Sequence, residues 1–156
     1  MKSKIVQSFV VFSICLLLLD CSDKPTTPED EIRLYLNTGV EAAESRNHGD
    51  LSDLIDDGYL DQKGMDKSQL LTLLRAYFFR HKNIYLFTKI RAITFPTDNE
   101  AMVTLHVAMA GSVISDANAL VNLRARMYRF ELQLVKENEW LLRSAKWQIA
   151  NMADMQ

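Results

Sequence analysis

The period of the hydrophobic residues changes near residue 84, and this change constrains the fold more than any other feature of the sequence. Before this point, apolar residues recur at the spacing of one face of an α-helix. After it, they alternate with polar residues or gather in β-branched and aromatic runs, as they do in strands. The chain therefore predicts helices first and strands second, the order typical of an α+β domain.

Three helices are expected in the first half. Thr27 and Pro28 begin the first, because a threonine N-cap, a proline at the first position and acids in the first turn all favour a helix start. Asp50 is the expected cap of a second, short helix, and Asp66 opens a third through a capping box. The expected core positions are Ile32, Leu36, Val40 and Ala43 in the first helix, Leu51, Leu54 and Ile55 in the second, and Leu70, Leu73, Leu74, Tyr77 and Phe78 in the third.

Four antiparallel strands are expected in the second half, at residues 84–95, 101–109, 124–135 and 140–149. Alternation places Val103, Leu105 and Val107 on one side of the second strand, with Thr104 and His106 on the other. Residues 111–123 fit either a loop or a loop with one helical turn. The predicted fold is therefore α+β, with three N-terminal helices packed on one face of a curved, mainly antiparallel four-stranded sheet.

The first 20 residues are typical of a signal peptide. Lys2 and Lys4 precede an apolar run at residues 5–19, which is shorter than the roughly 20 residues needed to cross a bilayer. An uncleaved N-terminal anchor is the alternative. The expected organisation is a signal peptide, a tether, one domain and a C-terminal tail, at residues 1–20, 21–27, 28–150 and 151–156.

The end of this leader resembles the lipobox of bacterial lipoproteins, in which the cysteine is lipidated. Cys21 occupies the cysteine position and Leu18 matches the family pattern, whereas Asp20 departs from the small residue usual before the cysteine. Cys15 lies inside the leader, so removal of the leader and lipidation of Cys21 would leave no free thiol in the domain. The resemblance implies a lipid-anchored protein of the cell envelope that faces the periplasm. Ser22 favours the outer membrane over the inner if the host is Gram-negative.

Charge is distributed unevenly along the chain. The formal net charge of −2 gives no argument for binding nucleic acid. Residues 29–66 nevertheless carry eleven acids and three bases, while residues 67–91 carry six bases and no acid. We interpret this as complementary elements of one fold, and a docking patch is the alternative.

The order of elements, together with residues 47–51, 54–59 and 140–147, resembles the nuclear transport factor 2-like (SnoaL-like) superfamily. The resemblance covers residues 29–150. It implies a cystatin-like cone, in which a curved sheet wraps around the first helix. The superfamily includes isomerases, dehydratases and polyketide cyclases as well as non-catalytic binding or assembly domains. Its enzymes typically place an aspartate, with histidine or tyrosine, inside the cone.

The candidate catalytic residues are Asp57, Tyr59 and His106. A carboxylate in an apolar pocket has a raised pKa and can move protons, with tyrosine or histidine as its partner. The competing interpretation is structural: Asp57 follows a helix end beside Gly58, a common solvated position, and His106 falls on the side of its strand opposite the apolar residues.

Arg124, Arg126 and Tyr128 are the candidate residues for binding a ligand or partner. Strand alternation places them on the presumed concave face of the sheet, where arginine can hold a carboxylate. The alternative is that a bulge turns the arginines outward, or that they pair with the acidic first helix.

The histidines do not indicate a metal site. His48, His81 and His106 are isolated and lack the spacing of a coordination shell, and no cofactor motif is found. We therefore expect a membrane-anchored, exported binding or assembly domain without catalysis, which binds a protein partner, a second copy or a small apolar ligand. The alternative is a small cone-fold isomerase, dehydratase or hydrolase that uses an aspartate with tyrosine or histidine.

Overall fold

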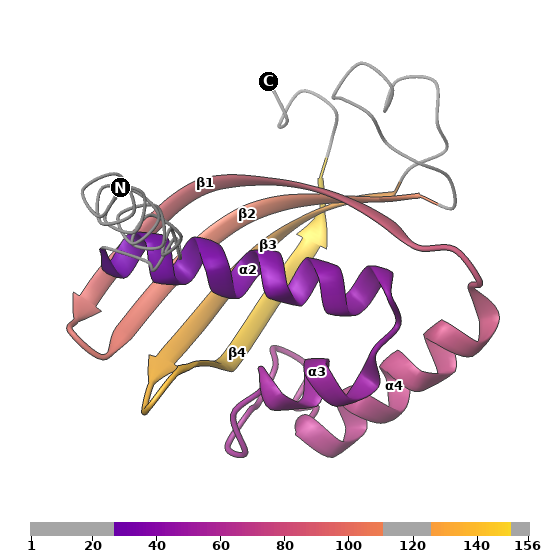
Figure 1. Ribbon diagram of the computed structural model, residues 1–156, viewed down its shortest axis with the longest axis horizontal. Helices are drawn as coiled ribbons and strands as arrows, with labels where there is room; N and C mark the ends of the chain where they lie inside the picture. Colours follow the sequence, from indigo (N-terminus) through magenta and orange to yellow (C-terminus); the bar gives the residue numbers. More distant parts are fainter. Residues whose placement is uncertain (1–26, 111–125, 151–156) are drawn as a thin grey trace, which may run out of the picture.

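The computed structural model describes residues 27–110 and 126–150, which form three helices followed by four strands (Figure 1). The sequence predicted this order, and each strand lies within two residues of its predicted bounds. Within the described residues, no helix has the length and hydrophobicity of a membrane span. The elements are α2 (Pro28–Glu44), α3 (His48–Asp53), α4 (Lys67–Arg80), β1 (Tyr85–Thr97), β2 (Glu100–Ala110), β3 (Arg126–Lys136) and β4 (Trp140–Ile149).

The four strands form one antiparallel sheet in the order β1-β2-β3-β4. The pairing register shifts between Ile90 and Ala92 in β1 and between Gln133 and Leu134 in β3. Such irregularities bend a strand and increase its twist. The sheet accordingly curves, and α2 lies across its concave face (Figure 1).

The hydrophobic core lies between α2 and this concave face. Ile32 of α2 is completely buried and belongs to one cluster with Val103, Leu105 and Leu134 of the sheet. Side chains alternate between the two faces of a strand, so the apolar side predicted for the second strand is the side that meets α2. The prediction that the helices cover one face of the sheet is confirmed.

Helix α3 begins earlier than predicted. Arg46 adopts a left-handed φ of 57°, which turns the chain after α2 and makes Asn47, rather than Asp50, the N-cap. The Asn47 Oδ1 atom accepts hydrogen bonds from the backbone nitrogens of Gly49 and Asp50, at 3.1 and 3.3 Å. His48 is consequently the first residue of α3.

Helix α4 begins at the predicted capping box. The Asp66 carboxylate accepts a hydrogen bond from the backbone nitrogen of Gln69 at 2.9 Å, and the Gln69 side chain accepts one from the Asp66 nitrogen at 3.0 Å. The prediction that Leu73 belongs to the core is wrong, since it is 50% exposed. Leu70 and Leu71 pack instead against a small cluster on the loop before α4, which turns the buried side of the helix away from Leu73.

The loop between α3 and α4 pairs with the edge of β4. The backbone nitrogen of Leu142 donates to the oxygen of Leu54 at 2.9 Å, and that of Asp56 donates to the oxygen of Leu142 at 3.0 Å. The buried Asp56 side chain also forms an ion pair with Arg143, with 3.0 Å between Oδ1 and Nε. The loop therefore covers a sheet edge that would otherwise present unpaired backbone groups.

Glu31 joins the start of α2 to the turn between β3 and β4. Its carboxylate accepts hydrogen bonds from Lys136 Nζ at 2.6 Å and from Trp140 Nε1 at 2.8 Å. Lys136 Nζ also lies 5.5 Å from the centroid of the Trp140 ring. The hydrogen bond with Lys136, followed by that with Trp140, lowers the pKa of the Glu31 carboxyl.

Replacing Glu31 with glutamine should therefore lower the free energy of unfolding at neutral pH by about 1 kcal/mol, because a charge-assisted contact becomes a neutral one at a partly exposed site. The folded-state pKa lies below the ordinary value of 4.5, so this stability is present above that value and is lost as the pH falls through the lowered pKa. Denaturant titrations of wild type and Glu31→Gln at about pH 7 and pH 3 should show that the difference between their free energies of unfolding becomes smaller in acid. An equal difference in the free energy of unfolding at both pH values would contradict the ion-pair explanation.

Candidate functional site

The three candidate catalytic residues do not converge. Asp57 is 98% exposed and forms an ion pair with Lys67, with 2.8 Å between Oδ1 and Nζ. Its hydrogen bond with Lys67 and the opposite charge lower the pKa of the Asp57 carboxyl, which is the reverse of what proton transfer at neutral pH requires. His106 lies on the sheet face opposite α2, with Arg91 and Arg129. The structure therefore keeps Asp57 and His106 apart.

Tyr59 is buried in the loop cluster. It is 3% exposed and packs with Ile55 and Ala145. Burial, with a smaller effect from Asp61, raises the pKa of the Tyr59 hydroxyl to about 12. The hydroxyl therefore stays protonated at neutral pH and cannot act as a base there.

The predicted binding residues lie at the start of β3. Tyr128 is half-buried, pairs with Val107, and its ring centroid is 6.2 Å from that of Phe130, a residue packed against the main core. For Arg126 the backbone alone is described, opposite Met109. Arg124 and Cys21 lie outside the described residues, so the roles predicted for the two arginines and for Cys21 stay predictions.

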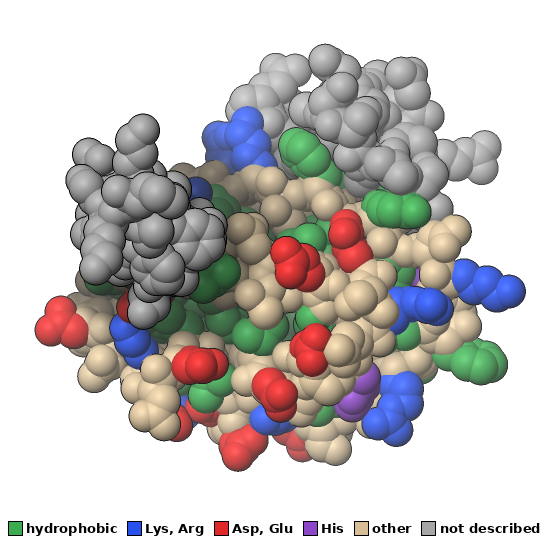
Figure 2. All heavy atoms as spheres, in the orientation of Figure 1, with side chains coloured by type: hydrophobic (Ala, Val, Ile, Leu, Met, Phe, Trp, Pro, Cys, Tyr) green, Lys and Arg blue, Asp and Glu red, His purple; other side chains and the backbone are tan. Residues whose placement is uncertain are grey.

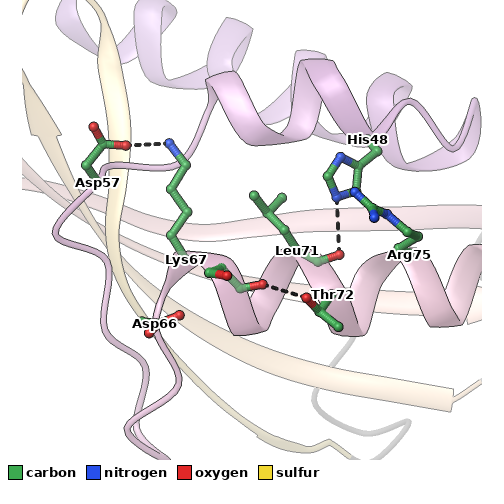
Figure 3. Close-up of a pocket in the computed structure, with 8 residues that line it drawn as sticks. His48, Asp57, Asp66, Lys67, Leu71, Thr72 and Arg75 are labelled. Carbon is green, nitrogen blue, oxygen red and sulfur yellow. Dashed lines mark hydrogen bonds and ion pairs between the residues drawn. The ribbon is translucent and has the colours of Figure 1, made fainter.

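A groove between α3 and α4 brings together polar residues that the sequence did not link. It has a volume of about 680 Å³ (Figure 3). Lys67, Leu71 and Arg75 follow one another at intervals of four residues along α4, and this spacing places them on one side of the helix. The residues that line the groove are His48, Asp57, Asp66, Lys67, Ser68, Leu71, Thr72 and Arg75.

His48 fixes the wall formed by α3. Its Nε2 atom lies 3.2 Å from the backbone oxygen of Leu71, and because a carbonyl oxygen can only accept, the proton of this hydrogen bond belongs to Nε2. Arg75 extends from α4 toward the His48 ring (Figure 3). The early start of α3 at Asn47 is what places His48 here.

The two cations of the groove differ in their surroundings. Lys67 is neutralised by Asp57, whereas Arg75 is exposed and has no ion pair with any residue of 27–110 or 126–150. An exposed guanidinium beside an imidazole can bind a carboxylate or phosphate through charge-assisted hydrogen bonds. Within those same ranges, no cluster of histidine, cysteine and acidic side chains could hold a metal ion. The exposed guanidinium of Arg75 therefore makes the groove suited to binding an anion.

A second hollow lies on the opposite face of the sheet. It has a volume of about 510 Å³, and Thr104, His106, Arg129 and Gln148 are among the residues that line it. The strand register sets His106 beside Arg129 and Arg129 beside Gln148. Arg129 already forms an ion pair with Glu131 at 3.1 Å, so part of the positive charge of this hollow is neutralised.

Comparison with known proteins identifies the fold. Neither a protein-family model nor a curated protein sequence matches the chain. A cystatin-like domain of unknown function from Nostoc punctiforme matches with a TM-score of 0.62 and 11% identity, over 85% of this chain and 83% of that one. A proposed dehydratase of the nuclear transport factor 2-like family from Streptomyces avermitilis matches with a TM-score of 0.65 and 17% identity, over 81% and 99%.

Two further structures extend the range of similar proteins. The LinA-type3 hexachlorocyclohexane dehydrochlorinase of Novosphingobium barchaimii has a TM-score of 0.59 and 10% identity, over 79% of this chain and 86% of the enzyme. Bd1075 of Bdellovibrio bacteriovorus has a TM-score of 0.63 and 10% identity over 77% of this chain, which spans 40% of that longer protein. Identities this low concern the fold and not the activity. The described domain has the cystatin-like cone fold of the nuclear transport factor 2-like proteins.

Proposed function

We propose that this protein is an exported binding domain, anchored to a membrane through Cys21, that holds an anionic group of its ligand or partner in the groove between α3 and α4. The leader at residues 1–20 and the cysteine that follows it support the location. The observation that carries the binding role is Arg75, an exposed cation that faces the groove with no ion pair among the described residues.

The geometry of the groove explains why it would bind an anion rather than transform it. Asp57 carries a lowered pKa and is held by Lys67, and Asp66 caps α4 through the backbone nitrogen of Gln69. Asp57 is therefore not poised to exchange protons at neutral pH, and Asp66 is occupied as the cap of α4. Arg75 remains to contact a carboxylate or phosphate, and the neighbouring Leu71 supplies apolar surface.

An enzyme of the same fold is the second candidate function, and the likeness to a dehydrochlorinase and to a proposed dehydratase favours it. Asp57, Tyr59 and His106 would not form its active site, because they point into three different environments. Recovery of a ligand that incubation with the protein leaves unchanged supports the binding role. Conversion of that ligand into a product would favour the enzyme.

Replacing Cys21 with serine should abolish lipidation and move the protein from the detergent phase toward the aqueous phase once the leader is processed. Two acyl chains anchor a protein stably, and a serine oxygen does not replace the cysteine sulfur as the acceptor. The measurement is uptake of labelled palmitate together with detergent-phase partition. Cys15→Ser is the matched control and should behave as wild type. Equal labelling of the two variants would show that Cys21 is not the site.

Replacing Arg75 with glutamine should weaken binding of a tetraglutamate peptide by about tenfold, which corresponds to about 1.4 kcal/mol and to the loss of one charge-assisted hydrogen bond. The titration is followed through backbone amide signals of the full-length protein in detergent micelles, with shifts expected at Ser68 and Thr72 because both line the groove. Arg33→Gln is the control, since Arg33 is an exposed arginine of α2 paired with Glu29. If both variants lost affinity for the peptide equally, the loss would come from the change in net charge, and this result would contradict a site in the groove.

A further inference from the structure

Helix α4 exposes an aromatic side chain that the fold does not use. Phe79 is 90% exposed, although its neighbour Phe78 is 9% exposed and belongs to the core. Successive helical residues point about 100° apart, so the burial of Phe78 directs Phe79 outward. An exposed apolar patch that is rimmed by polar residues commonly marks an interaction surface, so the residues around Phe79 decide what its exposure means.

Basic residues surround Phe79. Arg75 lies one helical turn before it on the same side of α4, Arg80 follows it directly, and Lys82 comes just after the helix ends. All three are exposed. Leu73, which is 50% exposed, adds apolar area on the adjoining side of the helix, about 120° around from Phe79. We call these five residues the α4 surface.

The charge of the α4 surface sets it apart from the rest of the domain. Between Asp66 and Asp98 the chain contains no acidic residue. Lys and Arg side chains gather on the side of the molecule where α4 lies, whereas Asp and Glu side chains lie mostly over α2 and below it (Figure 2). The occupant of the α4 surface must therefore carry negative charge and accept an aromatic ring.

We propose that the α4 surface docks onto an anionic membrane, with Phe79 in the interfacial region and the bases against lipid phosphates. Aromatic rings favour the boundary between headgroups and acyl chains, and basic residues are attracted to anionic headgroups. The α4 surface is an outward helix face and not a slot, which suits a bilayer better than an inserted acidic peptide.

The distance to the bilayer fits this arrangement, which rests on the proposed anchor at Cys21. Six residue steps separate Cys21 from Thr27, a reach of at most about 20 Å. The start of α2 and helix α4 lie toward opposite ends of the domain (Figure 1). An anchor near one end and the α4 surface at the other would hold the domain lying along the bilayer, with the groove beside the lipid headgroups.

The test uses the full-length protein in vesicles, with a local probe that separates the α4 surface from the leader. Phe79→Trp is incorporated into vesicles of brominated phosphatidylcholine, with or without about one third phosphatidylglycerol. The wild-type protein supplies the signal of Trp140 and Trp147, which is subtracted. After this subtraction, we expect bromine to quench the fluorescence of the tryptophan at position 79 in the anionic vesicles alone. Met102→Trp is the matched control, because Met102 is 40% exposed on the sheet face that points away from α2.

The charge contribution is read by adding Arg80→Gln to Phe79→Trp, which should lower the affinity of the docked state by about fivefold, the value of one base near an anionic surface. Quenching of Phe79→Trp that is no stronger in anionic than in neutral vesicles, or no stronger than for Met102→Trp, overturns the proposal. A response to tetraglutamate peptide and not to lipid also overturns it, in favour of a protein partner.

The same samples distinguish failure of this proposal from failure of the anchor. Protein that sediments with neutral vesicles but shows no lipid-dependent quenching at position 79 is anchored without α4 docking, and overturns the proposal. Protein that sediments with anionic vesicles alone, and is quenched there, lacks the anchor but docks through α4, and supports it.

Discussion

The burial of Ile32 against the concave face of the sheet is the contact on which the rest of the structure depends. Ile32 is completely buried, and Val103 and Leu134, the largest fully buried side chains of the sheet, lie in the same cluster. Its neighbour Glu31 holds the start of α2 to Lys136 and Trp140. One helical turn thus supplies both the apolar contact and the polar one. Once the start of α2 is fixed, its far end determines where the chain turns into α3.

That turn controls the candidate site. Arg46 reverses the chain with a positive φ, and Asn47 caps α3. His48 can then reach the backbone of Leu71 on α4. The loop that follows α3 is tied to β4 by backbone pairing and by the ion pair between Asp56 and Arg143. These contacts therefore hold the groove at both ends, although neither of its short helices would be stable in isolation.

The sequence was sufficient to predict the elements and insufficient to predict the site. The period of the apolar residues, the N-cap and proline at residues 27 and 28, and the capping box at Asp66 are local signals, and the structure has helices and strands where they indicate them. One error is local, since Asn47 rather than Asp50 caps α3, and the others concern tertiary packing. Leu73 has helical spacing with the core, yet the loop cluster draws Leu70 and Leu71 inward instead. His48 and Arg75 lie 27 positions apart in the sequence, so no local pattern links them. The interval of four residues between Lys67, Leu71 and Arg75 was the available signal.

The side chains of helix α4 lie in three environments, namely the core, the groove and solvent. Functions that use neighbouring sides of this helix can therefore interfere with one another. Phe78 faces the core, Lys67 lines the groove, and Phe79 points to solvent. Arg75 belongs to the groove and lies one turn from Phe79, so its guanidinium is on the border between groove and outward face. One cation cannot neutralise two anions at full strength. An anionic ligand in the groove and a lipid phosphate at the α4 surface would therefore compete for Arg75. By linkage, each would weaken the other's binding by the same factor.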